Sequence, residues 1–221
     1  SSDVCSSDLL KYNGVVYNEM KGAFSSPDEV LEREIMNHLF PDTTYGCESG
    51  GDPKNIPDLT YENFLNFHRT YYHPSNSYIY LYGNMDMEEK LAFLDEHYLS
   101  HFDYLDVDSV IQEQKAFGAC QDVTLEYPVA ENEGEEDNTY LSYNMVVGNA
   151  ADSQMAMAFE VLDYALLSAP GAPLKQALLD VKAGKDVYGS YDDGILQPYF
   201  TVIAKGSNPD RKEEFVSVIR R

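Results

Sequence analysis

The sequence is poor in positive charge and in cysteine, and it lacks both tryptophan and long apolar runs. Lys and Arg number 15 among 221 residues, against 38 Asp and Glu, so the formal net charge is −23 at pH 7. Nucleic acid and anionic membrane surfaces repel such a chain, so we expect neither as a partner. No stretch approaches the ~18 consecutive apolar residues of a membrane span. The charge is typical of an acidic, solvated surface and is compatible with basic ligands.

The three cysteines, Cys5, Cys47 and Cys120, lie far apart and form no CxxC pair. This spacing indicates neither a disulfide framework nor a thiolate zinc site. A reducing compartment is the simpler context, so we expect an intracellular protein of the cytoplasm or an organelle matrix. The first residues contain neither the basic n-region nor the apolar h-region of a signal peptide.

The residues that are present describe a globular chain, with 43% hydrophobic residues, 18 Tyr and 10 Phe. The opening SSDVCSSDL repeats a tripeptide without apolar periodicity, and residues 1–10 look foreign to the rest of the chain. The closing DRKEEFVSVIRR stops within a predicted helix. Both ends indicate a fragment.

Residues 12–23 follow a helical period and contain one carboxylate in an unexpected place. Their apolar stripe consists of Tyr12, Val16, Met20 and Ala23. Glu19 falls inside this stripe, where a carboxylate has to be neutralised, paired or bound. The pattern alone leaves open a plain alternative, in which Glu19 reaches water or pairs with Lys11 or Lys21.

The remaining patterns predict an α+β chain. Ser26 and Glu29 form a capping box for a helix that starts at Pro27 and ends before Pro41. Thr60 and Asp86 are expected N-caps of two further helices. Alternating Tyr and aliphatic residues predict a strand over 77–83. Further along we expect a connector over 103–118, strands over 123–127, 139–147 and 195–204, helices over 152–167 and after Pro173, and a helix opened by Asn208-Pro209. The strands over 123–127 and 139–147 would form a hairpin around the acidic turn 131–137.

Two blocks of this sequence resemble the presequence protease branch of the insulinase/pitrilysin zinc metallopeptidases. The first is GVVYNEMKGAFSSPDEVL with SGGDPKNIPDLTYENFLNFHRTYYHPSNSYIYLYGNMD, and the second is DYALLSAPGAPLKQALLD with VYGSYDDGILQPYFTVIAKG. The resemblance implies that Glu19 is the third protein ligand of a catalytic Zn²⁺. The family's HxxEH helix supplies the two other ligands and the general base.

This chain contains no HxxEH motif. Its histidines are His38, His68, His73, His97 and His101, and none has that spacing. We therefore expect no catalytic residue and no tight zinc binding in these residues alone. His97 and His101 share a helical face but have no evident third ligand. The glycines of SGGDP (49–53) favour a turn over an anion site, and residues 131–137 lack the alternating ligands of a calcium loop.

The resemblance implies insulinase-like domains, in which helices pack on antiparallel-rich sheets. We expect residues 11–103 to be the later half of a zinc-bearing domain, 104–118 a connector, and 119–221 the first half of a second, homologous domain. The complete protein is expected to degrade short unfolded peptides inside a clamshell chamber, with the remaining domains of the same chain as partners. The alternative is a non-catalytic family member that acts as a scaffold or chamber subunit.

Overall fold

A computed structural model of the chain describes residues 11–129 and 134–221. These residues form two compact units, one built from the described part of 1–51 together with 111–221, the other from 52–110. Each unit is described by itself.

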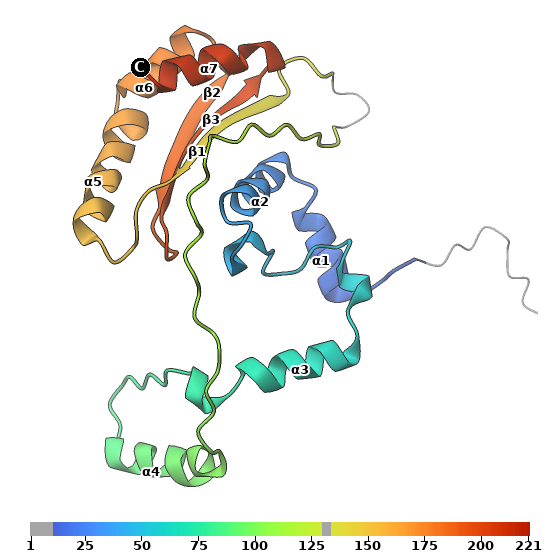
Figure 1. Cartoon of the computed structure of the whole chain (residues 1–221), viewed down its shortest axis with the longest axis vertical. Coiled ribbons are helices and arrows are strands. Elements are labelled where there is room, and N and C mark those ends of the chain that lie inside the picture. The colour runs from blue at the N-terminus through green and yellow to red at the C-terminus, as the bar shows by residue number, and fades with distance from the viewer. Residues whose placement is uncertain (1–10, 130–133) are drawn as a thin grey trace, which may run out of the picture. The chain divides into compact units, whose positions relative to one another are not determined.

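The larger unit is organised around a three-stranded antiparallel sheet (Figure 1). Its strands are β1 (Thr139–Val146), β2 (Asp186–Asp192) and β3 (Tyr199–Ser207), in the order β1-β3-β2. The central strand β3 aligns Val202 with Tyr143 of β1 and with Gly189 of β2. Aromatic and β-branched residues are frequent along β3, which suits a strand with neighbours on both sides.

Successive side chains of β3 point to opposite faces of the sheet, and each face carries its own apolar core. Phe200, Val202 and Ala204 belong to the first core. The helices on this face are α5 (Ser153–Asp163), its π-helical continuation Tyr164–Ser168, α6 (Pro173–Asp180) and α7 (Lys212–Ile219). Leu178 of α6 and Phe215 of α7 are 0% and 1% exposed, so these helices close this side of the sheet.

The second core joins the opposite face to α2 (Pro27–Leu39), the second of two N-terminal helices. The first is α1 (Val15–Ala23), which contributes no residue to this core, and a 3-10 turn over Thr44–Gly46 comes after α2. Ile35 of α2 and Phe40, which caps it, pack against Tyr199 and Ile203 of β3. Phe40 is fully buried, so this contact is the apolar anchor of the α1–α2 pair on the sheet.

The smaller unit, residues 52–110, contains α3 (Tyr61–Tyr71), α4 (Met87–His97) and three 3-10 turns, Ile56–Asp58, Pro74–Asn76 and Leu99–His101. None of its residues is buried. Contacts within this unit include the rings of His73 and Phe102, which meet edge to face, and a hydrogen bond that Ser75 accepts from the Leu105 amide. This unit therefore has no apolar core of its own.

Most of the predicted helices and their caps are confirmed. The Thr60 and Asp86 side chains accept hydrogen bonds from Asn63 N–H and Glu89 N–H, as N-caps should. Pro27 is the first residue of α2, but the capping box is wrong, because the Ser26 side chain makes no capping hydrogen bond. The connector is irregular, as expected.

Three predictions about strands need correction. Residues 77–82 form no regular element and pair with no strand in the described part of the chain, so the predicted strand over 77–83 is wrong here. No strand forms over 123–127 either, so β1 pairs with β3 rather than in the predicted hairpin. The strand β2 was not expected. Alternating residue types within one segment do not identify the strand to which it will hydrogen-bond. Whether the segment becomes a strand depends on that partner.

The foreign-looking residues 1–10 and part of the acidic turn, residues 130–133, lie outside the described residues. The assignment of 11–103 and 119–221 to two homologous domains stays a prediction. Residues 11–51, however, group with the sheet of the C-terminal half and not with 52–110.

Candidate functional site

The predicted zinc ligand Glu19 lies in the middle of α1. This helix begins after Gly14, whose backbone is extended, and Asn18 donates a side-chain hydrogen bond of 2.9 Å to Asn13 across its start. It ends at Phe24, whose N–H bonds to the Met20 carbonyl. The predicted helix is thus confirmed, although it begins at Val15 and leaves Tyr12, the first residue of the predicted stripe, outside it.

The structure leaves Glu19 exposed. Val15 and Val16 beside it are 85% and 56% exposed, and α1 contains no buried residue, so the expected apolar surroundings are not present. Neither Lys11 nor Lys21 pairs with the carboxylate, and no other group in residues 11–129 and 134–221 forms an ion pair or hydrogen bond with it.

The described residues do not by themselves form a zinc site. They hold no group of three or more His, Cys, Asp or Glu side chains that could bind a metal ion. His97 packs on the ring of Phe93 with ring centroids 4.6 Å apart, and His101 lies in the next 3-10 turn. A catalytic zinc needs three protein ligands, of which Glu19 would be one.

Two contacts link α1 to its neighbours in the larger unit. A Cβ atom at Gly50 would overlap with the flexible end of the Met20 side chain, so the loop at Gly50 lies directly against α1. The Gly51 backbone has a φ of 90° and its N–H bonds to the Glu48 carbonyl, which makes this glycine pair a turn, as predicted. The Arg33 guanidinium of α2 lies 4.0 Å from the ring centroid of Phe24.

A polar cluster that sequence reasoning missed joins the start of α2 to the sheet. The Asp28 carboxylate accepts hydrogen bonds from Lys205 Nζ at 2.7 Å, Tyr188 Oη at 3.2 Å and Tyr140 Oη at 3.4 Å. The hydrogen bond from Lys205 lowers the pKa of Asp28 and raises that of Lys205. Burial, and then the Asp28 charge, raise the pKa of Tyr188 to about 12. No local pattern signals this cluster, because the three donors lie 112 to 177 positions from Asp28 in the sequence.

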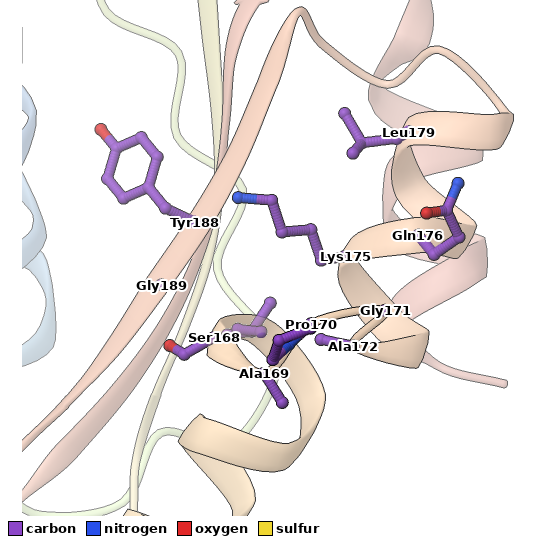
Figure 2. A pocket seen from close by; sticks show the side chains of 11 residues that line it. Ser168, Ala169, Pro170, Gly171, Ala172, Lys175, Gln176, Leu179, Tyr188 and Gly189 are labelled. Atoms are coloured by element: carbon purple, nitrogen blue, oxygen red, sulfur yellow. The ribbon is translucent and has the colours of Figure 1, made fainter.

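One pocket of about 460 Å³ lies at the edge of the sheet, between β2, the turn after the π-helix, and α6. Figure 2 shows Lys175 directed from α6 toward β2, with the Tyr188 side chain on the other side of the strand. Lys175 is the charged residue of the lining, and it pairs with Asp186 at 3.5 Å. Glu19 does not line this pocket, so the predicted site and the pocket are separate.

This arrangement of helices on an antiparallel sheet is the fold of M16-like peptidases. The crystal structure of an M16-like peptidase from Alicyclobacillus acidocaldarius matches 93% of this chain and 49% of its own, with a TM-score of 0.57 and 18% identity. The predicted α+β insulinase-like fold is therefore confirmed.

The sequence profile described as the peptidase M16 inactive domain matches residues 58–221. The chain belongs to the peptidase M16 family. It is 50% identical over 212 residues to protein HypA of Clostridium perfringens. It is 37% identical over 217 residues to presequence protease 1 of Arabidopsis thaliana, a chloroplastic and mitochondrial protein, and 33% identical over 217 residues to the mitochondrial presequence protease of Xenopus laevis. The resemblance to the presequence protease branch is confirmed.

Each of these three alignments covers 96% of this chain but only 20% to 22% of the relative. The chain thus spans about a fifth of the length of the curated relatives it matches. Among the described residues, no helix is both long and apolar enough to cross a membrane.

Proposed function

We propose that this chain is a section of a longer zinc-dependent endopeptidase that degrades short unfolded peptides inside a clamshell chamber. The alignment with presequence proteases over 96% of the chain is the observation that carries this proposal. The partners of the section are the remaining domains of the same protein, and its compartment is the cytoplasm or an organelle matrix. The section alone is inactive, because it holds no general base.

Glu19 is the proposed contribution of this section to the zinc. Its carboxylate is exposed and unpaired within the described ranges, which leaves its oxygens available. Oxygen from a carboxylate is an ordinary zinc ligand. The short helix α1 contacts its neighbours at Met20 and at Phe24 and carries this carboxylate at an exposed position.

The test is zinc content and peptidase activity of the complete protein with and without Glu19→Gln. We expect the variant to lose zinc and activity together, because an amide is a much poorer ligand than a carboxylate. Glu29→Gln is the matched control, since Glu29 is also an exposed helical carboxylate in the same unit. Unchanged zinc in Glu19→Gln would remove this residue from the site.

The second candidate is a non-catalytic family member that acts as a scaffold or chamber subunit. The profile that matches residues 58–221 is described as an inactive domain, which favours this alternative over other binding roles. The complete reading frame separates the two candidates, because the endopeptidase requires an HxxEH helix and the scaffold does not.

A further inference from the structure

One carboxylate touches all three strands of the sheet. Asp28 is the second residue of α2, and its donors come one from each strand: Tyr140 from β1, Tyr188 from β2 and Lys205 from β3. The shortest bond, 2.7 Å from Lys205, is charge-assisted. The Lys205 ammonium also lies 5.2 Å from the ring centroid of Tyr140, which brings two of the donors together.

The other end of α2 is held differently. Phe40 is buried against the rings of Tyr45 and Tyr199. Just beyond it, Gln114 donates a 2.7 Å hydrogen bond to Asp42 and accepts one of 2.9 Å from its amide. Apolar contacts are non-directional, so they hold this end without setting the direction of the helix axis. A second, directional attachment at the start of α2 is what sets that direction.

The helix α1 moves with α2 because only a short turn joins them. The Arg33 guanidinium stacks on Phe24, the residue that caps α1, with 4.0 Å to the ring centroid. Arg33 also pairs with Glu34 at 2.8 Å, and both side chains are mostly buried, so the stack has few alternative positions. A displacement of the start of α2 would therefore carry α1 with it.

The protonation states of Asp28, Lys205 and Tyr188 favour a structural role for these residues over a catalytic one. The hydrogen bond from Lys205 keeps the pKa of Asp28 low, so the carboxylate is ionised at neutral pH. The same bond raises the pKa of Lys205, and burial raises that of Tyr188 to about 12, so both donors keep their protons. A general base or an amine nucleophile needs the opposite shifts.

We propose that Asp28 is a positioning residue that fixes the start of α2 on all three strands and thereby sets where α1 places Glu19. The proposal rests on the proposed function in one respect, that Glu19 is the residue being placed. The positioning itself concerns α1, α2 and the sheet, and it is measurable without any metal.

The experiment compares amide hydrogen exchange in the complete protein, parent against Asp28→Ala. We expect exchange in α1 and α2 to become at least about tenfold faster, because several bonds to a charged group are lost. Exchange in α5, α6 and α7, on the far face of the sheet, should stay unchanged. Lys175→Met is the matched control: it removes an ion pair between a helix and β2 on that far face.

A uniform rise in exchange across all helices would show a merely structural role and overturn the proposal, as would unchanged exchange in α1 and α2. Lys205→Met should reproduce the pattern of Asp28→Ala in weaker form, because the hydroxyls of Tyr188 and Tyr140 still donate to the carboxylate. The double variant should be no worse than Asp28→Ala, because the bond from Lys205 is already lost in that variant. Additive effects would contradict the shared anchor.

Zinc content, measured by native mass spectrometry on the same samples, separates this proposal from the proposed function. If both hold, Asp28→Ala loses zinc more readily than Lys175→Met does, while Glu19→Gln loses zinc with its helix exchange unchanged. If Glu19→Gln retains zinc, the proposed function fails. The hydrogen-exchange data then still test whether Asp28 positions α1 and α2. If Glu19→Gln loses zinc but Asp28→Ala keeps zinc and has parent-like exchange, the positioning role of Asp28 is rejected and the proposed function stands.

Discussion

The Arg33 guanidinium of α2 lies over the ring of Phe24, with 4.0 Å between Cζ and the ring centroid. Phe24 ends α1, so this single stack joins the helix that carries Glu19 to the helix that packs on the sheet. A guanidinium over an aromatic face is attractive, and more so where water is partly excluded. The Arg33 side chain is only 17% exposed.

We expect Arg33→Met to lower the free energy of unfolding of this chain by about 1 kcal/mol, because the stem can still pack but the charge over Phe24 is lost. Urea unfolding measures the change. Arg211→Met is the control, since the exposed Arg211–Glu214 pair should contribute less than about 0.5 kcal/mol. Equal stability of Arg33→Met and the parent would show that the stack does not join the helices.

Gly189 of β2 faces Val202 of β3 in the ladder. A Cβ atom there would overlap with the Thr201 carbonyl oxygen and come within 2.6 Å of the Leu167 side chain. We expect Gly189→Ala to cost about 3 kcal/mol, because β2 has to move off β3. Gly22→Ala is the contrast: its Cβ would meet no described atom within 4 Å, so in α1 it should gain up to about 1 kcal/mol. Thermal unfolding of both variants checks the pair, and a tolerated Gly189→Ala would contradict the close approach.

Acid should weaken the attachment of α2. The hydrogen bond from Lys205 sets the pKa of Asp28 below its ordinary value of 3.8, so the folded state binds this proton less readily than the unfolded state. Stability from this group is therefore present above about pH 4 and lost as pH falls through the lowered pKa. We expect Asp28→Asn to show a smaller loss of stability than the parent between neutral pH and pH 2, measured by urea unfolding. Identical pH profiles would exclude the ionised pair.

High pH should also weaken this cluster, here because Tyr188 loses its proton. Burial and the Asp28 charge raise the pKa of Tyr188 from 10.0 to about 12, so the folded state holds this proton more tightly. The stabilisation is complete below about pH 10 and declines as pH rises toward 12. Tyr188→Phe should lack this part of the alkaline decline, although it is less stable than the parent at neutral pH. A decline of unchanged size in Tyr188→Phe would assign it to other groups.

Asp163, at the end of α5, is a carboxylate that destabilises the fold. Burial raises its pKa, and its Oδ1 has no hydrogen-bond partner among the described residues. Because the folded state prefers the protonated form, stability falls as pH rises through this raised pKa. We expect Asp163→Asn to gain about 1 kcal/mol at pH 7 and little at pH 3, where the carboxyl is already neutral. Asp95→Asn, at an exposed helical position, should change little at either pH.

Local patterns in the sequence were sufficient to predict the positions of the helices. Thr60 and Asp86 cap α3 and α4 through bonds to amides three residues ahead, and this range lies within any short sequence pattern. The helix of Glu19 was likewise predicted from its period. The family was recognisable from two blocks of the sequence, the first of which contains this helix. The matching profile and relatives confirm the family.

Strand formation and the polar cluster depend on partners that are distant in sequence. Residues 77–82 alternate as a strand should, but a strand also needs a neighbour for its backbone groups, and the described chain provides none. Conversely, β2 forms because Gly189 lets it pair closely with β3.

The sequence by itself thus determined the helices, the caps at Thr60 and Asp86, the acidic charge and the family, because each depends on nearby residues or on motifs read along the chain. Only the tertiary structure decided that α2 docks on the sheet through Asp28 and Phe40, and that Glu19 stands exposed. Those outcomes depend on contacts such as that of Asp28 with Lys205, 177 positions away, which no local pattern encodes.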